Sequence, residues 1–409
     1  MTTTKRENRT QRILIISIWE SLWSLGAGAG VSDDHHFIRK AHERGFEVHM
    51  VAPGARTGTF PGGGYQIHSY PDFFRATRWL PTVLKRVLWP LLFQVIALPA
   101  AVAAARRIRP DFILGHSHYT PLATWTAGRL TGVPFGVKLF GVMELVHMEW
   151  STMRYLYKNF EQIMALKIPQ DAWFILNDGT RGREAAIRLG VPPDRIHFLP
   201  NGIDVEWAER SIDREAVRAQ FGLPPGRPVV LFLARLVASK RPFDLLRSVP
   251  RATGGDGPRP LFLFVGDGPL RAACETYVRD HDLQDDVRFQ GAVPHESVPE
   301  IMSACDLFVT ISNLTNMAIP TCEAFLCGLP VVAYDVGDTA QVVKHNQRGL
   351  LVPDGDINRL ADAIMALAGD GERRARLGAN AKEFARREFT SWDERTAREF
   401  DLIESLLRK

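Results

Sequence analysis

The sequence predicts an α/β protein with two doubly wound domains. Short, continuously apolar runs alternate with segments of helical periodicity, which is the pattern of a parallel sheet covered by helices on both faces. The alternation begins near residue 13, stops at a polar stretch over 201–217, and then starts again. Two such series in a chain of 409 residues indicate two domains. Ligands of this architecture bind beyond the carboxyl ends of the strands.

The first series supplies an N-terminal domain, which we place at residues 13–204. Its first strand is "ILIISI" at 13–18, a Gly-rich loop covers 24–30, and a helix over 32–45 begins with a Ser/Asp cap and ends in glycine. The other expected strands cover 46–53, 111–117, 134–140, 172–177 and 196–200. The polar tail 1–12 lacks the apolar core of a signal peptide, so we expect it to fray.

The second series supplies a C-terminal domain, which we place at residues 205–390. Its first strand, 228–235, is followed by a helix from about Lys240. A strand with its loop is expected at 260–269, further strands at 286–291, 306–312 and 330–336, and helices at 270–281 and 316–328. The last of these helices has Pro320 near its first turn and ends with Gly328, which are typical start and stop signals.

The composition is that of a soluble globular protein, with 45% hydrophobic and 23% charged residues. The formal net charge of +4 suits anionic ligands or an acidic membrane surface. No run of Lys and Arg interleaved with aromatic residues suggests a nucleic-acid partner. The four cysteines form no CxxC pair, so we expect buried free thiols in a reducing compartment and therefore a cytoplasmic protein.

One uncharged segment, residues 87–105, complicates the soluble assignment. Its 19 residues reach the length of a marginal membrane span. Pro90, Gln94 and Pro99 interrupt it, and a span would split the regular α/β pattern. We favour a buried or half-buried helix; a helix on the membrane surface and a true span are the alternatives. Peripheral membrane contact is expected to involve residues 80–108.

Two loops carry groups suited to a phosphate. Glycines around Gly28 follow the first strand and precede a helix, where backbone N–H groups can approach a phosphate or a sugar. This loop lacks both the GxGxxG spacing and a P-loop Lys-Ser/Thr, so a flexible turn is the alternative. In the second domain, Arg235 and Lys240 flank a strand end and the next helix start, where two cations either bind a diphosphate or are simply solvated.

Glu323 is the one acid in the otherwise uncharged run from Ser312 to Ala333. The backbone amides of 316–319, just before it, lie at an expected helix N-terminus and suit phosphate oxygens. A carboxylate one turn later can accept two hydrogen bonds from a vicinal diol such as a ribose; a Glu paired on a helix face is the alternative. Asp356 in "DGD" is interpreted as a helix N-cap rather than as part of a metal-binding DxD.

Several segments occur in the order found in retaining glycosyltransferases of the GT-B fold. They are "NGID", "ARLVASKRPFDLL", "LFVGDGP", "VRFQGAVPHESVPEIMSACDLFV", "EAFLCGLPVVAYDVG" and "RGLLVPDGD". Over nearly its whole length the chain resembles glycosyltransferase family four. The resemblance implies an α/β GT-B protein with two Rossmann-like domains facing a central cleft. It places the acceptor mainly in the first domain and the nucleotide sugar in the second. It also implies a closing helix at 391–409 that crosses back to the first domain.

The resemblance implies metal-independent transfer, without any cofactor, from a nucleoside-diphosphate sugar to a glycan, lipid-linked or small-molecule acceptor. Such a role would fit polysaccharide biosynthesis at the inner face of the membrane. Arg235 and Lys240 match the cations that stabilise the leaving diphosphate, and Glu323 matches the acid that holds the ribose. The implied donor-binding residues are Gly28, Gly266, Asp267, Gly268, Val293, Thr315, Asn316, Met317, Ala318 and Ile319. His116, His118 and Glu144 are candidate bases for the acceptor hydroxyl, with a structural or capping role as the alternative.

Three positions depart from the family pattern. Thr315 stands where the family usually has the first of two glutamates, Phe140 replaces the histidine of a His-Gly pair, and Gln341 replaces a glutamate. The first two changes affect the region that contacts the donor sugar. Two alternatives therefore stay open: a non-catalytic binding or partner protein that kept the fold, and a nucleotide-sugar epimerase. Turnover with an acceptor distinguishes the transferase from both.

Overall fold

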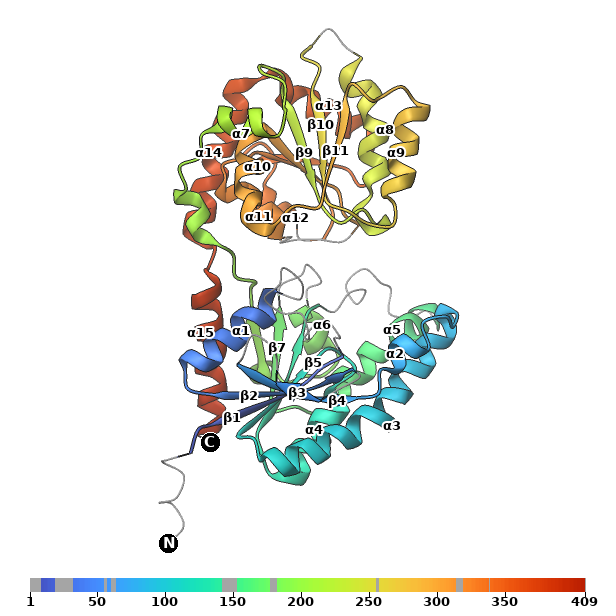
Figure 1. Ribbon diagram of the computed structural model, residues 1–409, viewed down its shortest axis with the longest axis vertical. Coiled ribbons are helices and arrows are strands. Elements are labelled where there is room, and N and C mark those ends of the chain that lie inside the picture. The colour runs from blue at the N-terminus through green and yellow to red at the C-terminus, as the bar shows by residue number, and fades with distance from the viewer. Residues whose placement is uncertain are drawn as a thin grey trace. The chain divides into compact units, whose positions relative to one another are not determined.

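The structure is a computed structural model that describes residues 9–18, 32–54, 57–59, 64–141, 153–176, 182–254, 257–313, 319–337 and 339–408. The chain divides into two compact units (Figure 1). Unit 1 comprises 1–177, 181–202 and 392–409, and unit 2 comprises 178–180 and 203–391. These limits lie close to the domain boundaries expected from the sequence, and the C-terminal helix α15 (Trp392–Leu407) belongs to unit 1.

The described strands of unit 1 form one sheet in the order β3-β4-β2-β1-β5-β6-β7-β8. All described pairs in it are parallel except β3–β4, which is antiparallel. The strands are β1 (Arg12–Ile16), β2 (Glu47–Pro53), β3 (Gly58–Thr59), β4 (Tyr65–Tyr70), β5 (Phe112–His116), β6 (Phe135–Leu139), β7 (Ala172–Leu176) and β8 (Ile196–Leu199). The helices are α1 (Ser32–Glu43), α2 (Phe73–Ala76), α3 (Thr82–Ile108), α4 (Pro121–Thr131), α5 (Met153–Lys167), α6 (Gly182–Arg188) and α15, with a 3-10 turn η2 (Pro193–Arg195).

The described strands of unit 2 form a second, parallel sheet in the order β11-β10-β9-β12-β13-β14. The strands are β9 (Val229–Leu233), β10 (Leu261–Val265), β11 (Val287–Gly291), β12 (Leu307–Thr310), β13 (Val331–Tyr334) and β14 (Gly349–Val352). The helices are α7 (Arg214–Gln220), α8 (Pro242–Thr253), α9 (Arg271–Asp280), α10 (Val298–Ala304), α11 (Ile319–Leu326), α12 (Thr339–Val343), α13 (Ile357–Gly369) and α14 (Gly371–Glu388). The 3-10 turns are η3 (Val205–Glu209), η4 (Ala238–Lys240) and η5 (His295–Ser297).

Both sheets carry an apolar core on each face, as continuously apolar strands predict. In β1, Ile13 and Ile15 pack into one cluster and Leu14 and Ile16 into another, because successive side chains point to opposite faces. The alternation repeats in β9 of unit 2, whose neighbouring residues pack into two separate clusters. Figure 1 shows helices on both sides of each sheet. The prediction of two doubly wound domains is therefore confirmed.

Strands β3, β4 and β14 are absent from the sequence-based expectations. In β4, Tyr65 and Ile67 are buried while Gln66 between them is exposed, so the strand alternates instead of reading as a continuous apolar run. Such alternation escapes a search for continuous apolar runs. Strands β3 and β14 lie at the edges of their sheets, and β4 lies next to an edge.

Helix α3 contains the uncharged segment and is half-buried. Its inner face packs Phe93, Ala97 and Ala101 into the core of unit 1, and all three are fully buried. Its outer face exposes apolar side chains in a stripe one turn apart, namely Val83 (61%), Val87 (53%), Leu91 (58%) and Val95 (71%). By length and composition alone, the stretch Val83–Ile108 is apolar enough to cross a membrane. The packed inner face instead favours the half-buried helix, and it leaves an apolar surface to be explained.

Three of the cysteines, Cys274, Cys305 and Cys322, are buried free thiols, and Cys327 is partly buried. Asp356 caps α13, because its carboxylate accepts a hydrogen bond from the backbone N of Arg359 (2.9 Å). The interpretation of Asp356 as a cap is thus confirmed.

Candidate active site

The loops at the carboxyl edge of the unit 2 sheet are tied together through their backbones. Ala234 N donates to Val265 O (3.0 Å), and Gly266 N donates to Gly291 O (2.7 Å). A Cβ at Gly266 would collide with the carbonyl oxygen of Ala234, and its φ of +126° disfavours any other residue. The loops after β9, β10 and β11 therefore approach one another closely, and they form a fixed surface at the edge where ligands of such sheets bind.

Two cations lie in the loop after β9. Arg235 follows the strand end by two residues and is exposed, whereas Lys240 ends the turn η4 and is half-buried. Burial lowers the pKa of Lys240, because the charged ammonium is partly removed from water. Within the described part of the chain, neither cation forms an ion pair. The next residue, Arg241, is by contrast paired with Asp244 and Asp354.

Glu323 lies in α11, next to this edge, and only 3% of it is exposed. Burial raises its pKa to about 7, although the nearby His295 lowers it in part. The His295 Nε2 atom is 3.8 Å from Glu323 Oε1 and 2.9 Å from Asp204 Oδ2. The bond to Asp204 raises the pKa of His295, and the imidazole also packs beside Trp207 (ring centroids 4.9 Å apart). Glu323 is thus a buried acid whose carboxylate lies at ion-pair distance from a histidine.

Other predicted donor residues lie at the same edge. Gly266, Asp267 and Gly268 follow β10, Val293 follows β11 and is half-buried, and Ile319 begins α11. Asn313 N, in the loop after β12, donates to Ser239 O in η4 (2.9 Å), which joins the loop before α11 to the loop of the two cations. The remaining predicted residues lie outside the described residues; they are Gly28, Glu144, Thr315, Asn316, Met317 and Ala318.

The candidate acceptor-side histidines lie at the carboxyl end of β5 in unit 1. His116 is fully buried, its Nδ1 is 3.1 Å from Asp34 Oδ1, and its ring packs against Phe140 (centroids 5.6 Å apart). His118 is partly exposed, and its Nε2 is 3.4 Å from Glu161 Oε2. The burial of His116 favours the structural role over direct contact with an acceptor, whereas His118 stays accessible.

Comparison with known proteins identifies the family. A family model described as Glycosyl transferases group 1 matches residues 213–384, and one described as Glycosyltransferase Family 4 matches residues 35–207. A 2-deoxystreptamine N-acetyl-D-glucosaminyltransferase of Streptomyces fradiae is 31% identical over 291 residues, which are 69% of this chain and 69% of that one. The chain belongs to the family-four glycosyltransferases. It is an enzyme of the transferase class.

Two other relatives of this glycosyltransferase differ in the sugar or in the compound that their names give. A 2-deoxystreptamine glucosyltransferase of Streptomyces kanamyceticus is 30% identical over 281 residues, which are 67% of this chain and 72% of that one. A D-inositol 3-phosphate glycosyltransferase of Nocardia farcinica is 30% identical over 213 residues, or 51% of this chain and 47% of that one. The alignment with the Nocardia protein thus spans about half of each chain.

Solved structures show that the glycosyltransferase has the GT-B fold. The Anabaena protein HepE in complex with UDP superposes with a TM-score of 0.71 and 19% identity, over 97% of this chain and 100% of that one. Sucrose-phosphate synthase from Thermosynechococcus elongatus gives a TM-score of 0.73 and 21% identity, over 97% and 99% of the two chains. At these identities the likeness establishes the fold alone.

The glycosyltransferase also contains a buried charge cluster in unit 1. Lys138 Nζ contacts Asp33 (2.8 Å) and Glu399 (2.7 Å), and Arg395 contacts the same two carboxylates (2.5 and 2.6 Å). Burial alone would raise the pKa of Asp33, but Arg395 and Lys138 outweigh it and lower that pKa to about 2. Ionised Asp33 therefore stabilises the folded state at pH values above the ordinary pKa of an aspartate. This stabilisation is lost as the pH falls through about 2.

Several of these residues could not be found from sequence spacing. Asp34 lies far from His116 in the chain, and Asp204 lies far from His295 and Glu323. The one local signal is "PHES", which places His295 directly after the loop of β11 that the resemblance assigns to the donor site.

Proposed function

We propose that this glycosyltransferase binds a nucleoside-diphosphate sugar at the carboxyl edge of unit 2 and transfers the sugar with retention of configuration. The observation that carries the proposal is the pair Arg235 and Lys240, which has no carboxylate partner among the described residues. Cations at a strand end without a protein counter-charge suit an anionic ligand, and the diphosphate supplies the missing charge.

The two cations have a chemical task in this reaction. The bond from the anomeric carbon to the diphosphate oxygen breaks, the acceptor hydroxyl oxygen bonds to that carbon, and the diphosphate gains negative charge. Arg235 and Lys240 stabilise this charge, so we propose that the transfer needs no metal ion. The departing diphosphate acts as the base and accepts the proton of the acceptor hydroxyl.

Glu323 is proposed to hold the ribose of the donor. An ionised carboxylate accepts hydrogen bonds from both hydroxyls of a vicinal diol, and its position in a nearly closed environment strengthens each bond. Because its pKa is raised to about 7, Glu323 changes protonation within the physiological range. Because the ribose binds to the ionised form of Glu323, we expect nucleotide affinity to increase as the pH rises through about 7.

A thermal-shift panel of nucleoside diphosphates and their sugars tests the donor site. UDP is included because HepE was crystallised with it. A true ligand at a hundredfold excess over its Kd stabilises the protein by about 2.7 kcal/mol. We expect this shift to shrink in Arg235→Ala and Lys240→Ala and to persist in Arg251→Ala, an exposed arginine of the same unit that pairs with Asp362. Equal shifts in all four proteins would reject the site.

Turnover separates the transferase from the alternatives. Product formed from donor plus acceptor supports the proposal. Binding without turnover, even with an acceptor that binds, would show a non-catalytic protein. Interconversion of nucleotide sugars without an acceptor would show an epimerase.

We further propose a cytoplasmic enzyme that contacts an anionic membrane surface through the outer face of α3. The exposed stripe Val83, Val87, Leu91 and Val95 is continuous, and Lys85 and Arg86 flank it near its start. Apolar side chains can enter the headgroup region while cations meet anionic lipids, which is the mode of interfacial helices.

Vesicle sedimentation tests this contact. We expect the wild type to bind vesicles that contain phosphatidylglycerol more strongly than vesicles of phosphatidylcholine, and Leu91→Glu/Val95→Glu to lose the binding. Leu130→Glu, at another exposed apolar position of unit 1 (56% exposed), is the control that should keep it. Wild-type binding in the double variant would exclude α3 as the contact.

A further inference from the structure

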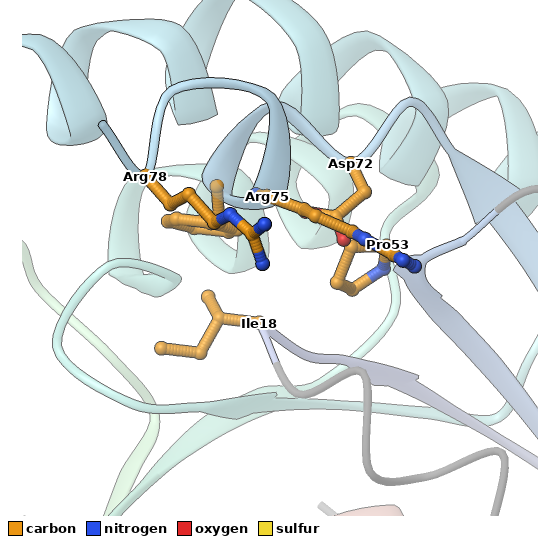
Figure 2. Close-up of a pocket in the computed structure, with 6 residues that line it drawn as sticks. Ile18, Pro53, Asp72, Arg75 and Arg78 are labelled. Carbon is orange, nitrogen blue, oxygen red and sulfur yellow. The ribbon is translucent and has the colours of Figure 1, made fainter. Parts of the chain in front are cut away.

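A depression of about 500 Å³ lies at the carboxyl edge of the unit 1 sheet (Figure 2). Its lining residues are Ile18, Pro53, Asp72, Phe74, Arg75 and Arg78. Ile18 follows β1, Pro53 ends β2, and Asp72 follows β4, so three neighbouring strands contribute to it. The volume is that of a small-molecule site, and its mixture of apolar walls and a few charged groups is typical of one.

The strand ends beneath the depression are held together by hydrogen bonds. The Tyr70 hydroxyl donates to Ser17 O (2.9 Å) in a buried contact. Ser17 N donates to Val51 O (2.8 Å), and Gly54 N donates to Tyr70 O (3.1 Å). The base of the depression therefore has a fixed geometry, as a binding site requires.

The turn that carries the two arginines is also fixed. Phe73 is buried, and Phe74 packs edge-on against Trp89 (ring centroids 5.1 Å apart). The Asp72 carboxylate accepts a hydrogen bond from Arg75 N (3.0 Å) and caps α2. The Trp89 indole donates to the hydroxyl of Thr77 (2.9 Å), directly before Arg78. The backbone thus presents Arg75 and Arg78 from a packed turn rather than from a mobile loop.

Arg75 and Arg78 are three residues apart on this turn, so they lie on the same side of it. Figure 2 shows both guanidinium groups extending over Ile18 and Pro53. Within the part of the chain that the structure describes, Arg78 forms no ion pair. Asp72, Arg75 and Arg78 are the charged groups among the described residues of the lining. Two guanidinium groups on one side of a turn suit a phosphate, whose oxygens accept from both.

We propose that this depression binds a phosphate group carried by the acceptor. The inference rests on the proposed transferase function, because it takes unit 1 as the acceptor side. Arginine presents a planar fork of donors that matches phosphate oxygens, and two forks can bind one phosphate from two directions. The site therefore selects anionic acceptors and disfavours cationic ones such as aminocyclitols. The apolar walls Ile18 and Phe74 contact the remainder of the acceptor beside its phosphate.

Equilibrium binding of matched probes tests the proposal. The probes are glycerol 3-phosphate and a short-chain prenyl phosphate, each beside its free alcohol, and they separate a soluble source of the phosphate from a lipid source. The nucleoside diphosphate that stabilises the wild type most is present throughout at a saturating concentration, so that the donor site is filled and cannot take up the probe. The proteins are the wild type, Arg75→Gln, Arg78→Gln, the double variant, and Arg106→Gln. Arg106 is an exposed arginine in the last turn of α3, at the end that leads into the amino-terminal end of β5.

We expect at least one phosphate to bind the wild type more tightly than its alcohol. Each single variant should weaken that binding about tenfold and the double variant about a hundredfold. Arg106→Gln should bind like the wild type, and affinity for the nucleoside diphosphate should be the same in all five proteins. Equal binding by the double variant and the wild type, or no preference of the wild type for either phosphate, overturns the inference. Failure of the wild type to bind any nucleoside diphosphate would instead refute the donor site.

Discussion

Two sites, one in each unit, use lysine and arginine in opposite ways. In unit 1, Lys138 and Arg395 are buried and share the carboxylates of Asp33 and Glu399. In unit 2, Arg235 and Lys240 lie at the sheet edge without an ion pair among the described residues. The same residue types thus hold a structure together at one site and stay available to a ligand at the other. What separates the two roles is whether the protein itself supplies the counter-charge.

The largest effect is expected from a substitution that breaks the buried charge cluster. Lys138→Met keeps the length of the side chain but leaves Asp33 and Glu399 with one cation between them. Because an uncompensated charge is then buried, we expect the free energy of unfolding to fall by about 3–5 kcal/mol. The measurement is the midpoint of urea unfolding.

The matched comparison is Arg235→Ala in unit 2. Arg235 is exposed and unpaired within the described residues, so its removal should change the free energy of unfolding by no more than about 0.5 kcal/mol. Nucleoside-diphosphate affinity should show the reverse order, with a large loss in Arg235→Ala. If the two variants were equally destabilised, the distinction between the two sites would be wrong.

The sequence predicted the cations at the sheet edge of unit 2 but not the buried charge cluster of unit 1, for a physical reason. A parallel sheet places every strand end at one edge, so the position of Arg235 and Lys240 after an apolar run already locates them in space. The partners of Lys138 come instead from the start of α1 and from α15, near the two ends of the chain. No local pattern connects such residues, and only the folded chain brings them together.

The same limit applies to the histidines and to the depression lined by Arg75 and Arg78. His116 and His118 have the same sequence signal at the end of β5, yet one is fully buried beside Asp34 and the other is partly exposed. Arg75 and Arg78 follow β4, a strand that alternates polar and apolar residues and so escapes a search for apolar runs. A site built on an unrecognised strand cannot be predicted from the strands that were recognised.

The second expected effect concerns Glu323, a buried acid whose proposed ligand is a diol rather than a cation. Its folded pKa of about 7 exceeds the ordinary value of 4.5, so the folded state holds this proton more tightly than the unfolded chain. The stability contributed by the proton is complete below pH 4.5 and is lost as the pH rises through about 7. Glu323→Gln should therefore be more stable than the wild type at pH 8, by about 3 kcal/mol at most, and equal to it near pH 4.5.

Thermal unfolding of both proteins across this pH range measures the effect. His295 loses its own stabilising charge as the pH rises, in the same direction, so His295→Gln in parallel separates the two contributions. Glu323→Gln should also bind the nucleoside diphosphate more weakly, since a neutral amide accepts weaker hydrogen bonds than a carboxylate. Parallel pH–stability curves for the wild type and Glu323→Gln would show that Glu323 does not titrate in this range.

The smallest effect is expected from Arg241, which allows a paired and an unpaired cation to be compared within one loop. Arg241 follows Lys240 directly, but it pairs with Asp244 and Asp354 and lies over the ring of Tyr334 (5.1 Å to the centroid). These exposed or partly exposed ion pairs contribute little to stability, so Arg241→Gln should lower the free energy of unfolding by no more than about 1 kcal/mol. Nucleoside-diphosphate affinity should stay within about twofold of the wild type. If Arg241→Gln instead reduced affinity as much as Lys240→Ala, pairing within the protein would not decide which cations serve the ligand.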